Sequence, residues 1–106
     1  MTETITLNGK TFYSKNDVQS PFPIKIVVLQ RGWVVVGRYE RKGDQCFLYD
    51  ASVIRNWGTT RGLGEIAKDG PTKETVLDKC FGIVEFESLT KVLSIEVEQE
   101  KWENIL

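Results

Sequence analysis

The chain has 106 residues, with 14 Lys and Arg against 15 Asp and Glu, two Cys and no His. This length corresponds to one domain, and the nearly balanced charge gives no overall attraction to nucleic acid or to an anionic membrane. The lack of His excludes Ser-His-Asp and Cys-His catalysis, and two Cys alone cannot complete a zinc site of thiolates and imidazoles. We therefore expect no catalytic residues, no metal and no cofactor.

The apolar runs of the sequence are short. The densest ones, Ile26–Leu29 and Trp33–Val36, fall far below the roughly 18 residues that indicate a membrane span. Met1–Lys10 lacks the apolar region of a secretory signal. These features predict an intracellular protein that does not engage a membrane, with Cys46 and Cys80 reduced and packed in the core.

The N-terminal part predicts a hairpin followed by a loop. Ile5-Thr6-Leu7 and Thr11-Phe12-Tyr13 flank Asn8-Gly9, and Asn-Gly is the strongest two-residue hairpin signal. Residues 14–23 are polar and end in Pro-Phe-Pro, which is typical of a loop.

The next part of the chain favours strands. Apolar β-branched runs predict strands over 24–30 and 33–41, joined by a turn at Arg31-Gly32. Gly37, inside the second strand, predicts a bulge or a close approach of the backbone. A turn over 42–44 then leads to a strand over 45–49, which residues 53–57 continue or follow.

After a polar loop over 58–64 the pattern changes. The spacing of Leu63, Ile66 and Ala67 predicts a short helix over 62–69, ended by Gly70-Pro71. Another helical turn is expected over 72–78. Strands are predicted over 81–86 and 91–97, and a terminal helical segment anchored by Trp102 over 98–106.

These elements predict a β-rich α+β fold, a mainly antiparallel β-sheet with one or two short helices. Residues 1–106 are expected to form a single domain. Within it, 1–23 would be a hairpin and loop extension, 24–97 the core, and 98–106 the C-terminal helical segment.

The charges are unevenly distributed. All five Arg lie between Arg31 and Arg61, a stretch with six basic and three acidic residues. Glu85–Leu106 holds six acidic residues and two basic ones. Because Arg suits bidentate recognition of phosphate or carboxylate, the middle of the chain predicts a focused anion site. The alternative is that these arginines pair with the acidic C-terminal segment, within the chain or across a subunit contact.

The segment from Arg55 to Gly64 is the best candidate for a ligand site. Arg55 and Trp57 are two residues apart and would share a face of a strand, where a guanidinium could bind phosphate beside an indole that stacks on a base. Thr59 and Thr60 offer hydroxyls, and one of them could cap the following helix. The alternative is a plain strand-to-helix turn with a core Trp. Trp33, near Arg31, makes a second Arg-aromatic pair, or is simply an aromatic of the sheet.

Four segments, in their order and spacing, resemble a family of small bacteriophage proteins: Gly37-Arg38-Tyr39, Gly43–Ala51, Arg55-Asn56-Trp57-Gly58 and Leu63–Gly70. The family pattern combines a strand containing Gly, a Gly turn into a second strand, an Ala-x-x-x-Arg-x-Trp segment and a helix with the sequence Leu-x-x-Ile/Leu-Ala-x-x-Gly. A late strand rich in Ile, Val and Glu follows, so the resemblance spans about residues 25–97. The family is associated with the anti-CBASS sponge proteins of phages.

This resemblance implies an oligomeric protein, a dimer or tetramer, in the host cell cytoplasm. It would bind a cyclic dinucleotide similar to 3',3'-cGAMP and sequester it without cleavage, so the protein would not be an enzyme. The resemblance also makes the turn from Gln30 to Trp33 a second wall of the site, although the family has Gly and Tyr in this turn. The expected ligand-binding residues are Gln30, Arg31, Trp33, Arg55, Trp57, Thr59, Thr60 and Arg61. One alternative is a phage protein that inhibits a host protein, which would dock on the acidic tail Glu96–Glu103. The other is a protein that binds single-stranded nucleic acid.

Overall fold

The computed structural model describes residues 4–7, 10–13 and 22–106. Strands β1 (Thr4–Leu7) and β2 (Lys10–Tyr13) pair antiparallel as a separate two-stranded sheet. The predicted hairpin is therefore confirmed in its strands. The predicted Asn8-Gly9 turn, and residues 14–21 of the predicted loop, lie outside the described residues.

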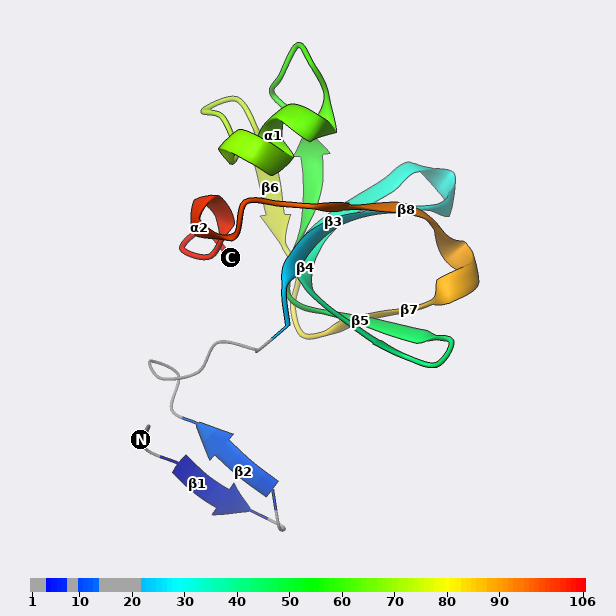
Figure 1. The fold of residues 1–106 in the computed structure, drawn as a ribbon, viewed down its shortest axis with the longest axis vertical. Helices are drawn as coiled ribbons and strands as arrows, with labels where there is room; N and C mark the ends of the chain where they lie inside the picture. The colour runs from blue at the N-terminus through cyan, green and yellow to red at the C-terminus, as the bar shows by residue number, and fades with distance from the viewer. Residues whose placement is uncertain (1–3, 8–9, 14–21) are drawn as a thin grey trace.

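The remaining strands form one antiparallel sheet in the order β6-β5-β4-β3-β8, with β7 also paired to β5 (Figure 1). The elements follow in chain order as β3 (Ile24–Leu29), a 3-10 turn η1 (Gln30–Gly32), β4 (Trp33–Lys42), β5 (Gln45–Asn56), α1 (Leu63–Asp69), β6 (Val76–Lys79), β7 (Val84–Glu87), a 3-10 turn η2 (Ser88–Thr90), β8 (Lys91–Glu96) and α2 (Gln99–Trp102). The expected fold class, a β-rich α+β protein with an antiparallel sheet and two short helices, is confirmed.

Strand β5 bends in the middle, so that its two halves pair with different neighbours. Residues 45–48 pair with β7 and residues 52–56 with β6. The pairing of β4 with β5 shifts register between Val36 and Arg38, and Asp50 has a φ of 54°. A Cβ at Gly37 would lie 3.0 Å from the Tyr49 carbonyl oxygen, which confirms the close backbone approach predicted there. As a result the sheet curls, with β3 and β8 facing the first half of β5 and β7 (Figure 1).

Both faces of the central strands are buried, which explains why β3 and β4 read as continuous apolar runs. On one face a cluster lies under the helices and contains Ile24, Ile26, Val34, Val36, Ile54, Ile66, Ala67 and Trp102. On the other face a second cluster fills the curl and contains Val27, Val35, Cys46, Leu48, Ala51 and Phe86. Cys46 is a buried free thiol, and Cys80 packs against the second cluster, as expected.

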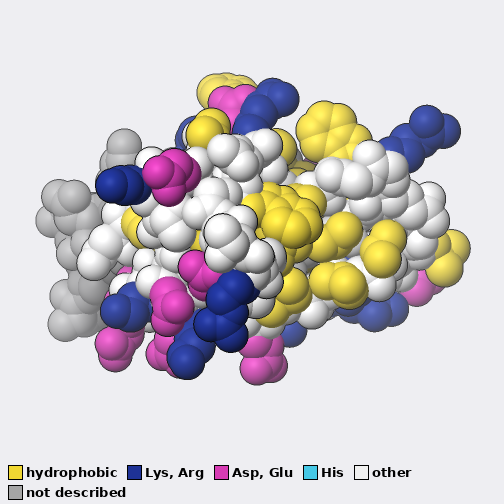
Figure 2. Space-filling model, turned by 90° about the horizontal axis from the view of Figure 1, so that it is seen from above, with side chains coloured by type: hydrophobic (Ala, Val, Ile, Leu, Met, Phe, Trp, Pro, Cys, Tyr) yellow, Lys and Arg dark blue, Asp and Glu magenta, His cyan; other side chains and the backbone are white. Residues whose placement is uncertain are grey.

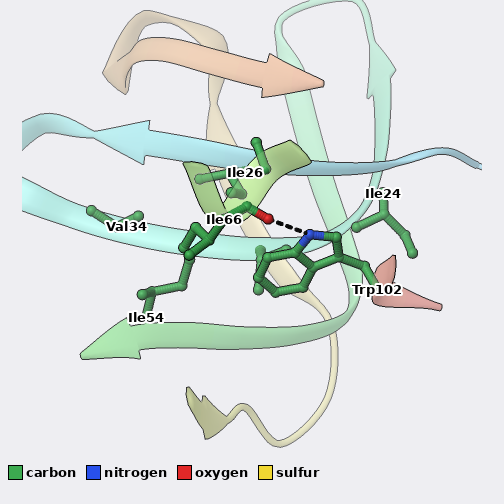
Figure 3. Close-up of a cluster of buried hydrophobic side chains, with 8 residues drawn as sticks. Ile24, Ile26, Val34, Ile54, Ile66 and Trp102 are labelled. Atoms are coloured by element: carbon green, nitrogen blue, oxygen red, sulfur yellow. Dashed lines mark hydrogen bonds between the residues drawn. The ribbon is translucent and has the colours of Figure 1, made fainter. Parts of the chain in front are cut away.

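Trp102 closes the first cluster, as the sequence predicted for an anchor. It is 0% exposed, and its Nε1–H donates to the Ile66 carbonyl oxygen at 3.0 Å (Figure 3). Gln99 adds a second link, because its side chain accepts from the Ile24 N–H at 2.8 Å and donates to the Ile24 carbonyl at 3.0 Å. The C-terminal segment is thus fixed both to α1 and to the start of β3.

Three predictions for the second half of the chain are wrong in part. Residues 72–78 are not helical: a turn over 72–75 leads into β6, which pairs with β5. The strand predicted over 81–86 begins at Val84, because only 84–87 align with β5. The terminal helix is confined to Gln99–Trp102. In each case pairing with β5, or the docking of Trp102, overrides the local pattern.

Tyr39 of β4 and Tyr49 of β5 are expected to lower the free energy of unfolding at alkaline pH, because the pKa of each is raised in the folded chain. A hydrogen bond from the Tyr49 hydroxyl to Glu40 Oε1, at 2.6 Å, is the main cause that raises the pKa of Tyr49 to about 12. Burial, followed by the hydrogen bond with Cys46, raises the pKa of Tyr39 to about 12.

Both phenols ionise more readily in the unfolded chain, where the pKa of tyrosine is about 10. Their contribution to the free energy of unfolding is therefore complete below about pH 10 and is lost as the pH rises towards 12. Urea unfolding followed by circular dichroism should show this decline. It should be smaller in Tyr49→Phe, and an equal decline in that variant would contradict the role of Tyr49.

Candidate ligand-binding site

The loop between β5 and α1 is held in one shape by threonine hydroxyls. The Thr59 hydroxyl accepts from the Gly62 N–H at 2.7 Å and donates to the Gly62 carbonyl at 3.0 Å. Thr72 Oγ1 donates to the Gly58 carbonyl at 2.8 Å, and Thr75 Oγ1 donates to the Trp57 carbonyl at 2.7 Å. The hydrogen bonds from Thr72 and Thr75 therefore fix the backbone at Trp57 and Gly58, and those of Thr59 fix the rest of the loop.

Thr59 thus has a different role from the one predicted. No side chain caps α1, whose N-cap is Gly62. The Thr59 hydroxyl instead bridges the loop to Gly62, donating one hydrogen bond and accepting another within the fold. Thr60 is exposed.

Gly58 is required where two backbone segments meet. Its φ is +72°, and a Cβ there would collide with the Thr75 nitrogen and lie 2.6 Å from the Glu74 carbonyl carbon. The space beside this glycine is therefore taken by the 72–75 turn. Sequence reasoning missed Thr72 and Thr75, since it assigned that segment to a helix.

Trp57 is not a core residue, so the alternative that this segment is a strand-to-helix turn with a buried Trp is wrong for Trp57. Its side chain is 42% exposed, and it lies just beyond the end of β5 at Asn56. The pairing of β5 with β6 is irregular between Ile54 and Asn56. The two-residue spacing predicted that Arg55 and Trp57 share one face of a strand. Because Trp57 lies outside β5, strand alternation does not put the two side chains on the same face.

The turn between β3 and β4 carries the second Arg-aromatic pair. Arg31 lies in η1 with a φ of 69°, and Trp33, at the start of β4, is 52% exposed. The Gln30 side chain donates to the Leu89 carbonyl at 3.5 Å, which links η1 to η2. Among the three residues expected to form a second wall of the ligand site, Arg31 and Trp33 are therefore exposed to solvent, whereas Gln30 is hydrogen-bonded to Leu89.

The five arginines divide into two groups. Arg38, Arg41 and Arg55 each pair with an aspartate, namely Asp50 at 3.6 Å, Asp44 at 3.9 Å and Asp78 at 2.9 Å. None of these three aspartates belongs to the acidic Glu85–Leu106 segment, so these ion pairs do not support the alternative that the arginines pair with that segment within the chain.

Arg31 and Arg61 form the other group. Neither has an ion pair with a carboxylate in the part of the chain that the structure describes. Arg61 borders a shallow cavity of about 220 Å³ that is also lined by Gly64, by the cation Lys68 and by the carboxylates Glu65 and Asp69, so the cavity holds two basic and two acidic side chains. Along the chain, Arg31 lies two residues from Trp33 and Arg61 lies four residues from Trp57, the two exposed indoles.

The expected site residues thus fall into two loops and one strand. Trp57, Thr59, Thr60 and Arg61 lie in the β5–α1 loop; Gln30, Arg31 and Trp33 lie at the β3–β4 turn. Because β4 begins at Trp33 and its antiparallel partner β5 ends at Asn56, both loops lie at the same end of this strand pair, as separate projections in Figure 1. Arg55 is held apart from them by Asp78 of β6.

Helix α1 covers only part of the sheet face on its side. Helix α1 has seven residues and is about 10 Å long, whereas β3 beneath it spans about 20 Å. The helix therefore leaves part of the sheet face uncovered, and Leu93 of β8 remains 45% exposed. Figure 2 shows hydrophobic side chains gathered on one half of this side of the molecule and charged side chains around them.

Residues 22–106, together with β1 and β2, contain no cluster of three Cys, Asp or Glu side chains placed to bind a metal. Within the same residues no helix is long and apolar enough to cross a membrane. No family model matches the chain, and comparisons with curated proteins and with solved structures give no match either.

Proposed function

We propose that this chain binds a cyclic dinucleotide and sequesters it without cleaving it, and so counters a bacterial anti-phage signal. The observation that carries the proposal is that the two arginines without an aspartate partner lie within four residues, along the chain, of the two most exposed indoles. Exposed tryptophan and unpaired arginine together supply base stacking and phosphate binding.

The chemistry of the ligand class matches this arrangement. A cyclic dinucleotide presents two bases and two phosphates. Stacking of one base on an aromatic side chain is worth about 1–3 kcal/mol, and hydrogen bonds to a charged group are about twice as strong as neutral ones. Trp57 with Arg61 would serve one base and one phosphate, and Trp33 with Arg31 would serve the others. Arg55 would contribute only by exchanging Asp78 for the ligand.

The test is isothermal titration calorimetry of the purified chain against a panel of cyclic di- and trinucleotides, with chromatography of the recovered ligand. We expect binding to at least one member and an unchanged ligand. Heat from none of them would overturn the proposal and redirect the search to a host protein. Recovery of a linear product would replace sequestration by hydrolysis.

Substitution of the indole and of its arginine should weaken binding of the same ligand. Trp57→Ala and Arg61→Ala are each expected to raise Kd by roughly tenfold or more, from the loss of about 1–3 kcal/mol. Arg41→Ala is the matched control, because Arg41 is exposed and pairs with Asp44 in a distant turn. An equal loss in Arg41→Ala would indicate general charge attraction instead of a site.

A further inference from the structure

Strand β8 leaves one edge of the large sheet open. It pairs with β3 on one side, and nothing among residues 4–7, 10–13 and 22–106 pairs with its other side. Exposed edges are normally blunted by a charge, a proline or a bulge, because their free N–H and C=O groups can pair with another chain. The only such irregularity described in β8 is at Val92, which has no partner in β3 because the register shifts between Leu93 and Lys91. Residues 92–95 contain neither charge nor proline.

The side chains along this edge are unusually exposed for apolar residues. Val92 is 61% exposed and Leu93 is 45% exposed. On the helix side, a groove of about 310 Å³ runs along the same edge between α1 and β8, lined by Gly64, Ala67 and Lys68 of α1 and by residues 95–98. A Cβ at Gly64 would meet no atom within 4 Å, so the groove is open at that point.

We propose that the β8 edge is a dimer interface, at which a second copy of this chain adds its own β8 in antiparallel pairing about a two-fold axis at Ser94. Two-fold pairing within one sheet keeps each residue opposite one that points to the same face. Leu93 and Ile95 lie opposite Val28 and Ile26 on the helix side, whereas Ser94 and Glu96 lie on the other side. An axis at Ser94 centres the new pairing on residues 93–95, within the 93–96 part of β8 that pairs regularly with β3.

This register is complementary in shape. Leu93 lies opposite Ile95 of the partner subunit, and the partner's Leu93 lies opposite Ile95 in return. Ile95 lines the groove beside Gly64, so each exposed leucine would fill the other copy's groove. A self-complementary contact of this kind is what a closed dimer requires.

The register is also complementary in charge. Glu96 lies opposite the partner's Val92 and next to the partner's Lys91, so each end of the paired strands brings one carboxylate to one ammonium group. Like charges directly opposite each other would oppose pairing, and this register brings none together. Both α1 helices and both β5–α1 loops would lie on the same side of the joined sheet. The pairing itself does not depend on the proposed ligand.

The test is the oligomeric state of the ligand-free chain, measured by sedimentation velocity over a range of concentrations. We expect a reversible dimer. Leu93→Glu should raise the dimer dissociation constant by at least about 100-fold, because the substitution places two carboxylates against apolar side chains at once. Ile83→Glu is the matched control, since Ile83 is an aliphatic side chain of similar exposure, 54%, next to β7 at the opposite edge. It should leave the dimer intact.

A monomeric wild-type chain overturns the proposal, as does a dimer that survives Leu93→Glu. Equal loss in Leu93→Glu and Ile83→Glu would also overturn it, because that result indicates nonspecific association of apolar patches. Hydrogen exchange of the unmodified chain gives a second measure that needs no variant. Protection of the β8 amides should rise with protein concentration while that of β6 stays constant, and parallel behaviour of the two strands would contradict pairing through β8.

Discussion

Replacing Trp102 by alanine is expected to lower the free energy of unfolding by about 3–5 kcal/mol. Trp102 is the largest fully buried side chain, and it packs against residues of β3, β4, β5 and α1 (Figure 3). Its removal leaves a cavity between the sheet and the helices. Because a domain of this size is stable by only about 5–15 kcal/mol, a large part of the total would be lost.

The hydrogen bond of the indole can be separated from its volume. Trp102→Phe keeps most of the apolar contact but removes the indole N–H that donates to the Ile66 carbonyl at 3.0 Å, which then keeps only the Gly70 N–H at 2.8 Å. We expect a smaller loss for this variant, about 1–3 kcal/mol, and little change for Trp57→Ala, in which the removed indole is exposed. Urea unfolding followed by circular dichroism measures all three. Equal losses at positions 57 and 102 would contradict the burial that distinguishes them.

Replacing Gly58 by alanine is expected to have the next largest effect, a loss of at least about 2 kcal/mol. The left-handed backbone, with a φ of +72°, disfavours any Cβ. The added methyl group would also push against the backbone of Thr75 and Glu74, so one of the two segments must move. Movement would break the hydrogen bonds from Thr72 and Thr75 to the carbonyls of 58 and 57.

Gly58→Ala should therefore affect ligand binding as well as stability, since those hydrogen bonds fix the backbone of Trp57. Gly64→Ala is the matched control for stability: it lies in α1 without a positive φ and has open space around it, so its free energy of unfolding should be unchanged or slightly higher. Unfolding curves of both variants measure the effect on stability, and calorimetric titration of Gly58→Ala against the unsubstituted chain measures the effect on binding. A Gly58→Ala chain with the stability of Gly64→Ala would refute the close approach of the 72–75 turn.

Much of the fold follows from local sequence. The apolar runs of β3 and β4, the glycine in β4 and the spacing of α1 each determine structure over a few residues, and each prediction is confirmed within one or two positions. The 72–78 segment shows the limit of this reasoning. Its residues have no strong local preference, and pairing of 76–79 with β5, a contact distant in sequence, makes them a strand.

The candidate site was only partly predictable for the same reason. The sequence by itself determined the β-rich class and the burial of Trp102 as an anchor, because these depend on residue type and short spacing. Only the tertiary structure decided which arginines are already paired, since Arg55 meets Asp78 only after β6 has joined β5. It also decided that α1 is too short to cover the sheet and that β8 ends at an open edge, because coverage and edges are properties of how elements assemble.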